Sequence, residues 1–162
     1  MKKLTKTIYS AIIPWSNVRG KINKLYKKMD KSHIRGRKFF VQYYSYLMER
    51  RYHCRISPGA DIGHNLYLPH PDGVIIGEKS KIGNNVIIYQ QVTIGQNHGK
   101  YPVIGDNVII YAGAKVIGDV HVGNNSIIGA NAVVVKDVPA NSVWGGNPAR
   151  ELKKRDNKKE YR

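Results

Sequence analysis

An aliphatic residue recurs at every sixth position through the middle of the chain, and this spacing restricts the fold more than any other feature. Glycine often follows the aliphatic residue directly, and a small or β-branched residue usually follows it four places later. A fixed short period of this kind marks a repeat architecture. The aliphatic positions form three runs: Ile56, Ile62 and Leu68; then Ile76, Ile82, Ile88 and Ile94; then Ile104, Ile110, Val116, Val122, Ile128 and Val134.

A six-residue period favours short β-strands joined by tight corners. A helix needs apolar residues about 3.6 apart, whereas a strand needs them about 2 apart, and six is a multiple of two. Glycine supplies corners at which φ is positive, and six-residue repeats are typical of β-helices. We therefore predict a mainly β fold, a triangular coil of parallel strands. Three repeats should close one turn, so residues about 18 apart should lie one above another, about 4.8 Å away.

Two breaks in the period predict loops on this coil. The step across residues 68–76 is two residues longer than one repeat, and the step across residues 94–104 is four residues longer. The first break contains His70 and the second contains His98. Insertions in repeat proteins go to loops on one face, which is often the binding face. We therefore expect both loops to lie at the functional site.

The net charge of +16 is concentrated before the repeat, because residues 1–55 contain 15 Lys and Arg against 2 Asp and Glu. Apolar stripes at helical spacing predict two or three helices there, packed on the coil or on a neighbouring subunit. The alternative is that this basic arm lies on an anionic membrane surface. The arm is rich in tyrosine, but no nucleic-acid motif accompanies these residues, so nucleic acid is not an expected partner. The stripes are Leu4, Ile8, Ala11 and Ile12, ending before Pro14; Val18, Ile22, Leu25, Tyr26 and Met29; and Phe40, Val41, Tyr44, Leu47 and Met48.

Composition excludes two other classes of protein. The single cysteine, Cys54, excludes an internal disulfide framework and suits a reducing compartment. No stretch approaches the roughly 18 apolar residues of a membrane span, and the basic N-terminus lacks the apolar core of a signal peptide. We expect a cytoplasmic protein, with the membrane's inner face as an alternative location. Its predicted parts are a helical arm (1–54), the β-helix (55–148) and a basic tail (149–162).

Four motifs resemble those of the hexapeptide-repeat acyltransferases, most closely the branch that is similar to serine acetyltransferases and includes polysaccharide O-acetyltransferases. They are residues 70–78 (His-Pro-Asp-Gly-Val-Ile-Ile-Gly-Glu), 91–95 (Gln-Val-Thr-Ile-Gly), 135–139 (Val-Lys-Asp-Val-Pro) and 145–150 (Gly-Gly-Asn-Pro-Ala-Arg). The resemblance implies a left-handed parallel β-helix and a homotrimer with active sites between subunits. It also implies acetyl-CoA as donor and a hydroxyl group as acceptor.

The resemblance implies that His70 is the catalytic base. A neutral imidazole with a pKa near 6.5 suits removal of a hydroxyl proton at neutral pH. In serine acetyltransferases an aspartate fifteen residues upstream orients this base, but that position is Arg55 here. We therefore expect Asp72 or a backbone carbonyl to orient the ring.

The resemblance also implies contacts to acetyl-CoA. Lys136, Arg150 and Lys153 match positions that contact the phosphates or the adenine end of CoA. Tyr111 and Gly129 are eighteen residues apart and match the ladder along which pantetheine lies. Tyr111 stands where a small residue is usual, so it should narrow the CoA channel.

The acceptor side of the site departs from serine acetyltransferases. An arginine–histidine–proline motif that helps to hold serine in that family reads Lys100-Tyr101-Pro102 here. We therefore expect a sugar hydroxyl of a surface polysaccharide or its precursor as acceptor, contacted by His98, Lys100 and Tyr101. The alternatives are serine O-acetylation, N-acetylation of an amino sugar, and a non-catalytic scaffold with a membrane-binding arm.

The other histidines are not expected to form a metal site. His64 and His121 are predicted at the surface of the coil, and His33 and His53 belong to the arm. No two histidines are eighteen apart, so none should lie one above another at metal-binding distance.

Overall fold

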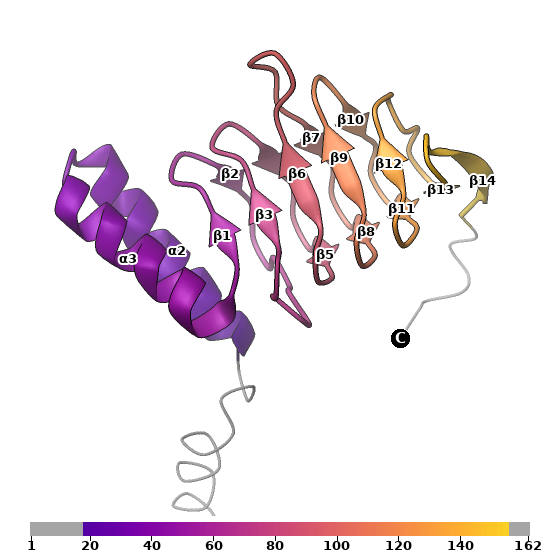
Figure 1. The fold of residues 1–162 in the computed structure, drawn as a ribbon. Coiled ribbons are helices and arrows are strands. Elements are labelled where there is room, and N and C mark those ends of the chain that lie inside the picture. Colours follow the sequence, from indigo (N-terminus) through magenta and orange to yellow (C-terminus); the bar gives the residue numbers. More distant parts are fainter. Residues whose placement is uncertain (1–17, 156–162) are drawn as a thin grey trace, which may run out of the picture.

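The computed structural model describes residues 18–155, in which two helices cover one end of a β-helix (Figure 1). Helix α2 is Val18–Ile34 and helix α3 is Lys38–Tyr52. The helix expected before Pro14 and the end of the basic tail lie outside the described residues. The strands are β1 (Arg55–Ile56), β2 (Asp61–Ile62), β3 (Ile75–Ile76), β4 (Lys81–Ile82), β5 (Ile87–Ile88), β6 (Thr93–Gly95), β7 (Val103–Ile104), β8 (Ile109–Ile110), β9 (Lys115–Ile117), β10 (His121–Val122), β11 (Ile127–Ile128), β12 (Val133–Val134), β13 (Ser142–Gly145) and β14 (Arg150–Lys154).

The strands form three sheets, one on each side of a triangular coil. Sheet A has the order β1-β3-β6-β9-β12, sheet B has the order β10-β7-β4-β2, and sheet C has the order β14-β13-β11-β8-β5. All pairs are parallel except β13 with β14, which is antiparallel. The coil is a left-handed parallel β-helix, which confirms the predicted fold class.

Strand register confirms both breaks in the six-residue period. Ile76 pairs with Ile94, eighteen residues later. Pairs that span the first break are two residues further apart, as Ile56 with Ile76. Pairs that span the second break are four residues further apart than the regular step, as Ile82 with Ile104. Each insertion therefore leaves the coil as a loop and does not disturb the ladders above and below it.

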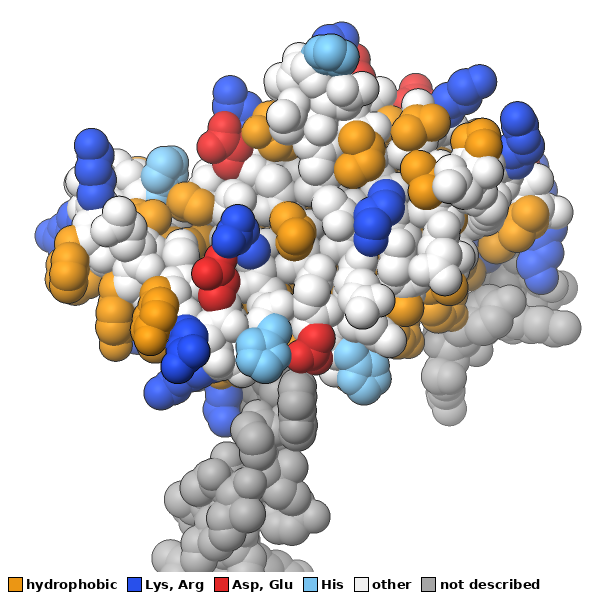
Figure 2. Space-filling model, viewed as in Figure 1, with side chains coloured by type: hydrophobic (Ala, Val, Ile, Leu, Met, Phe, Trp, Pro, Cys, Tyr) orange, Lys and Arg blue, Asp and Glu red, His pale blue; other side chains and the backbone are white. Residues whose placement is uncertain are grey.

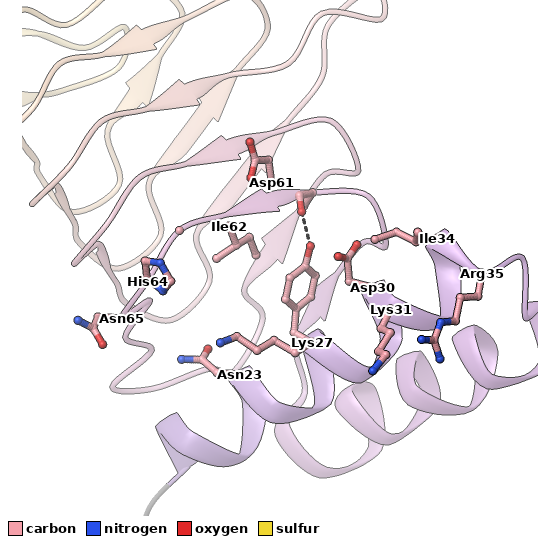
Figure 3. Close-up of a pocket in the computed structure, with 13 residues that line it drawn as sticks. Asn23, Lys27, Asp30, Lys31, Ile34, Arg35, Asp61, Ile62, His64 and Asn65 are labelled. Carbon is pink, nitrogen blue, oxygen red and sulfur yellow. Dashed lines mark hydrogen bonds between the residues drawn. The ribbon is translucent and has the colours of Figure 1, made fainter.

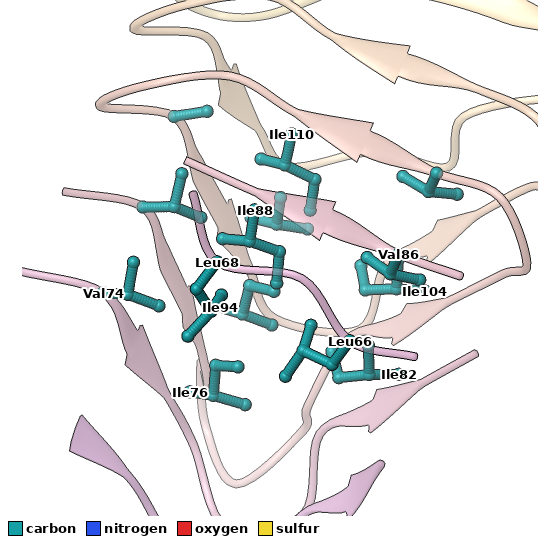
Figure 4. Close-up of a cluster of buried hydrophobic side chains, with 14 of the residues drawn as sticks. Leu66, Leu68, Val74, Ile76, Ile82, Val86, Ile88, Ile94, Ile104 and Ile110 are labelled. Atoms are coloured by element: carbon teal, nitrogen blue, oxygen red, sulfur yellow. The ribbon is translucent and has the colours of Figure 1, made fainter. Parts of the chain in front are cut away.

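The repeated aliphatic residues point into the coil and form its core (Figure 4). Ile76, Ile88, Ile94 and Ile110 have no more than a trace of exposed surface. Burial of a side chain of this size stabilises the fold by about 1.5–3 kcal/mol. The helical arm continues this core, because Ile22, Met29 and Met48 are also fully buried. The predicted packing of the arm on the coil is therefore confirmed for the described helices.

Glycine was predicted to supply the positive φ values at the corners of the coil, but at the corner between sheets B and C it does not. The positive φ values there belong to a column of asparagines, whose amide groups are hydrogen-bonded from coil to coil at 3.1–3.3 Å. Gly83 is needed for a different reason, because a Cβ atom there would lie 2.7 Å from the carbonyl group of Gly105. The glycine after the aliphatic residue therefore provides space for the next coil. The asparagines are Asn65, Asn85, Asn107, Asn125 and Asn141.

The first part of the predicted basic tail belongs to sheet C. Strand β14 turns back from the last coil and pairs with β13, with Arg150 opposite Gly145 and Lys153 opposite Val143. Lys153 and Lys154 are part of this strand. Backbone pairing with β13 orders them in spite of their charge.

Candidate functional site

His70 lies on the loop that joins sheet C to sheet A. The loop follows Tyr67, which bridges to Ile87 of β5, and it ends at β3. Gly73 has a φ of 70°, which permits the tight turn, and the Gln91 N–H donates to the Asp72 carbonyl group at 2.8 Å. His70 itself is exposed. The loop is thus fixed to the coil above it while the expected base faces solvent.

Asp72 contacts a different histidine from the one expected. Its Oδ1 atom lies 3.1 Å from Nδ1 of His53, and within residues 18–155 no hydrogen bond joins it to the His70 ring. His53 ends helix α3 in the left-handed conformation (φ 48°, ψ 33°), from which its side chain reaches the loop. The prediction had assigned His53 to the arm and missed this contact. His53 precedes Gly73 by twenty residues, which is the length of the coil that contains the first break. This spacing could have placed His53 directly below the loop.

Arg55, which stands where the family's orienting aspartate is found, is paired with another residue. Its Nε atom donates to Oε1 of Glu49 at 2.6 Å, and both side chains are partly exposed. The Glu49 carboxylate therefore lies near the start of the coil, but it is bound by Arg55. Within the described residues no carboxylate is hydrogen-bonded to His70, and a backbone carbonyl as orienter of that ring stays a prediction.

The second loop lies at the corner between sheets A and B. Lys100 Nζ donates to Oδ2 of Asp119 at 2.6 Å, and this hydrogen bond raises the pKa of Lys100. The Tyr101 ring lies against Gly77, where a Cβ atom would be 2.8 Å from it. Loss of water contact, and then the nearby Glu78 carboxylate, raise the pKa of the Tyr101 hydroxyl. Lys100 and Tyr101 are thus fixed on the coil, whereas His98 is at the exposed tip of the loop.

The two loops do not share one face, which corrects that expectation. The His70 loop precedes strand β3 of sheet A, and the second loop follows strand β6 of the same sheet. The two loops therefore lie at opposite ends of the strands of sheet A, on different corners of the coil (Figure 1). Four repeats separate the two breaks, and three repeats make one turn, so the second insertion falls one corner further round the coil. His70 and His98 of a single chain therefore do not form one site.

The predicted cofactor ladder lies on the same corner as His70. Tyr111 and Gly129 are one coil apart, since the Tyr111 N–H donates to the carbonyl group of Ile128, directly before Gly129. The ring of Tyr111 stacks on that of Tyr89 from the preceding coil. Sequence reasoning missed Tyr89, although it precedes Tyr111 by the 22-residue step of that coil. These residues form a column that rises from the His70 loop.

The three predicted phosphate contacts are divided between two parts of the chain. Arg150 and Lys153 are both on β14, at the end of sheet C, and are exposed. Lys136 is exposed on the turn after β12 that leads to Val138, which bridges to β10 of sheet B. Lys136 therefore shares the corner of the second loop. Arg150 and Lys153 therefore share one strand, whereas Lys136 is on a separate turn, although the Ala149 N–H joins the start of β14 to the Val133 carbonyl group of β12 at 2.8 Å.

A cavity of about 630 Å³ lies between helix α2 and the first coil (Figure 3). Its lining includes Tyr26, whose hydroxyl donates to the carbonyl group of Ala60, and Asp30 and Asp61, which border that tyrosine. Burial, and then these two carboxylates, raise the pKa of Tyr26. None of the predicted site residues lines this cavity, so we do not place the chemistry there.

Two further properties bear on the site. Among residues 18–155, no group of three or more His, Cys, Asp and Glu side chains could hold a metal ion. Neither α2 nor α3 is long and apolar enough to cross a membrane.

Two family models match the coil. One, "Bacterial transferase hexapeptide (six repeats)", matches residues 101–136, and the other, "Hexapeptide repeat of succinyl-transferase", matches residues 59–90. Over these two stretches the β-helix of this chain is similar to transferase hexapeptide repeats. Neither model matches the helical arm.

The chain is also similar to serine acetyltransferases. The chain is 50% identical over 102 residues to "Serine acetyltransferase" of Staphylococcus aureus (strain Mu50 / ATCC 700699), which covers 60% of this chain and 48% of the relative. The crystal structure of serine acetyltransferase from Brucella abortus strain S19 is 34% identical with a TM-score of 0.80, covering 83% of this chain and 56% of that one. The same protein in complex with coenzyme A is 33% identical with a TM-score of 0.79, covering 82% and 55%. This chain spans about half the length of the curated relatives it matches.

Proposed function

We propose that this protein is an acetyl-CoA-dependent O-acetyltransferase in which His70 is the general base. The observation that carries the proposal is that His70 shares one corner of the coil with the Tyr111–Gly129 column. The relatives support it, because they are named serine acetyltransferases and one of them was solved with coenzyme A. A thioester laid along the column would end near the imidazole.

In the proposed reaction, His70 removes the proton of the acceptor hydroxyl as its oxygen attacks the thioester carbonyl carbon. The C–S bond then breaks, CoA leaves as a thiol after taking the proton from His70, and the acetyl group stays on the acceptor oxygen. Backbone N–H groups of a glycine-rich turn are adequate donors to the transient oxyanion. Holding both substrates together supplies much of the rate.

Lys136, Arg150 and Lys153 are proposed to bind the phosphates or the adenine end of CoA. All three side chains are exposed. Arginine binds phosphate through two parallel hydrogen bonds, and lysine acts as a mobile point charge.

We propose a homotrimer, because the two loops of one chain lie at different corners of the coil. In each chain, the corner that carries His70 precedes the strands of sheet A, and the corner that carries His98 follows them. In a ring of three copies, the first corner of one subunit can adjoin the second corner of the next. Each such junction would combine His70 with His98, Lys100 and Tyr101 of a neighbour. The assembly mass in solution tests this proposal directly.

The proposed acceptor is serine or a sugar hydroxyl. The expectation of a polysaccharide sugar is less well supported than the serine alternative, because the relatives are named for serine. Two departures from the family's sequence pattern still favour a sugar: Arg55 stands where the orienting aspartate is found, and Tyr101 stands where the serine-holding histidine is found. N-acetylation of an amino sugar would use the same donor.

Peripheral membrane contact is a further part of the proposal. Aromatic side chains are exposed on α3, where Phe39 is 74% and Tyr46 56% accessible. Figure 2 shows hydrophobic side chains next to Lys and Arg over the helical arm. Exposed aromatic residues beside cations suit an anionic bilayer surface. The protein would then work at the cytoplasmic face of a membrane.

The deciding experiment is release of CoA thiol from acetyl-CoA with L-serine, neutral sugars and amino sugars as acceptors. Turnover with one of them at a rate well above acetyl-CoA hydrolysis supports the proposal. If no acceptor releases thiol and calorimetry detects no CoA binding, the protein is a scaffold, and vesicle binding then becomes its primary property.

A further inference from the structure

His53 supports the loop that carries the expected base. The Gly73 N–H donates to the His53 carbonyl group at 2.7 Å, and Nδ1 of His53 lies 3.1 Å from Oδ1 of Asp72. Asp72 and Gly73 follow His70 on the same loop. The imidazole of His53 therefore lies beside the site, directly below this loop.

The backbone of His53 adopts a conformation that few residues other than glycine use, although histidine enters it more readily than most. Its φ of 48° and ψ of 33° are in the left-handed region, at the end of α3. Glycine or asparagine is favoured at this position, because a larger side chain crowds the following carbonyl oxygen. A residue that holds a disfavoured conformation next to a site points to a role for its side chain.

Stability does not explain why histidine occupies this position. The side chains of His53 and Asp72 are 68% and 45% exposed. Ion pairs that are this exposed add little to the free energy of unfolding. Helix α3 would end equally well at a glycine, so the His53–Asp72 contact is not needed to end the helix.

The contact to Asp72 determines which ring nitrogen of His53 is available. A carboxylate accepts hydrogen bonds, so Nδ1 carries the proton that is donated to Asp72. In the neutral ring, Nε2 then holds a lone pair that points away from Asp72. A fixed acceptor nitrogen of this kind binds a hydroxyl or ammonium donor.

We propose that His53 is a substrate-binding residue of the acyl acceptor, and that Asp72 positions it. Nε2 of His53 accepts a hydrogen bond from a hydroxyl or ammonium group of the acceptor, while His70 acts on the reacting hydroxyl. This rests on the proposed acetyltransferase function. It also gives Asp72 a role in place of the expected one, since Asp72 holds His53 and thereby the acceptor.

The test varies acceptor concentration at saturating acetyl-CoA, using L-serine or the sugar that releases most thiol in the acceptor panel. His53→Asn and His53→Gly both suit the left-handed backbone, so both should fold and keep the end of α3. We expect the acceptor KM to rise at least tenfold in both variants, with the acetyl-CoA KM changed less than twofold. An unchanged acceptor KM in both variants overturns the inference.

Asp72→Asn tests the positioning role. The 15N chemical shifts of the His53 ring should show Nε2 unprotonated in the neutral wild-type ring and a mixture of tautomers in the variant. The acceptor KM should rise about three- to tenfold, and Glu49→Gln, which breaks the neighbouring exposed ion pair, should leave it unchanged. An identical His53 tautomer in both proteins contradicts the assigned role of Asp72. If the wild-type protein transfers acetyl to no acceptor, the proposed acetyltransferase function is wrong, and the inference about His53 is wrong with it.

Discussion

The ring of Tyr89 lies nearly flat on the ring of Tyr111, with centroids 5.1 Å apart and planes inclined by 20°. The stack joins two successive coils on the corner that also carries His70. Aromatic pairs of this kind contribute about 0.5–1.5 kcal/mol beyond their buried area. In the proposed enzyme the same rings narrow the channel of the donor, so they link stability to the choice of acyl group.

Replacing Tyr111 with alanine should widen that channel. We expect turnover of butyryl-CoA relative to acetyl-CoA to rise about fivefold or more, because the ring no longer fills the space beside the thioester. Loss of the stack should lower the free energy of unfolding by about 1 kcal/mol. Tyr89→Phe keeps an aromatic ring and serves as the control. An unchanged acyl preference in Tyr111→Ala would remove this column from the donor site.

His70→Asn should reduce kcat by about 100-fold or more, which is in the range for removal of a general base. The exposed ring makes no hydrogen bond within residues 18–155, so the variant should retain its thermal midpoint. CoA binding measured by calorimetry should also be retained. Full turnover by a correctly folded His70→Asn protein would show that another group is the base.

Arg150 and Lys153 can be tested as phosphate contacts by a double change to alanine. We expect the KM of acetyl-CoA to rise about tenfold, with a weaker dependence on salt, because two cations are lost from the phosphate site. Lys154→Ala on the same strand is a matched control, since Lys154 pairs with Glu151 at 2.9 Å. Equal effects of the double variant and the control would indicate only a general loss of positive charge.

Cys54 should not react with thiol reagents in the native protein at pH 8. Burial raises the pKa of this thiol from 9.0 to about 12, with smaller contributions from Asp72 and Glu49. Reagents attack the thiolate, so Ellman's reagent should label Cys54 only after unfolding. Rapid labelling in the folded state would contradict its burial, and it would also disturb the thiol-release assay.

The same thiol predicts a loss of stability at alkaline pH. Because the pKa is higher in the folded chain, the unfolded chain releases its proton first, and stability falls as pH rises from about 9 to about 12. The slope from this group is at most about 1.4 kcal/mol per pH unit. Urea titrations at pH 8 and pH 10 should show a smaller decline for Cys54→Ala than for the wild type.

Gly83→Ala should destabilise the coil by about 1–3 kcal/mol, the range for inserting an extra methyl group into a closely packed position. The new Cβ atom would lie 2.7 Å from the backbone of Gly105, where neither chain segment can move freely. Gly95→Ala is the control, because its nearest neighbour would be 3.5 Å away. Equal thermal midpoints for the two variants would contradict the close approach.

The six-residue period was sufficient to predict the coil, its core and the places where the two loops leave it. An inward-facing aliphatic residue and a short strand recur together, so this information is local and appears directly in the chain. Ile56 pairs with Ile76, and Ile82 with Ile104, in the registers that the counted breaks require. The positions of Tyr111 and Gly129 on one ladder followed from the same count.

Tertiary structure alone decided which side chains meet. The count of four repeats between the breaks, with three repeats to a turn, already places His70 and His98 on different corners, but it does not say which side chains contact them. Asp72 contacts His53 because α3 ends in a left-handed residue directly below the loop; the 20-residue step places His53 below Gly73, but not the direction of its side chain. Local hydrophobic patterning therefore specifies the coil, whereas the partners within the site are set by backbone geometry at the junction of the arm and the first coil.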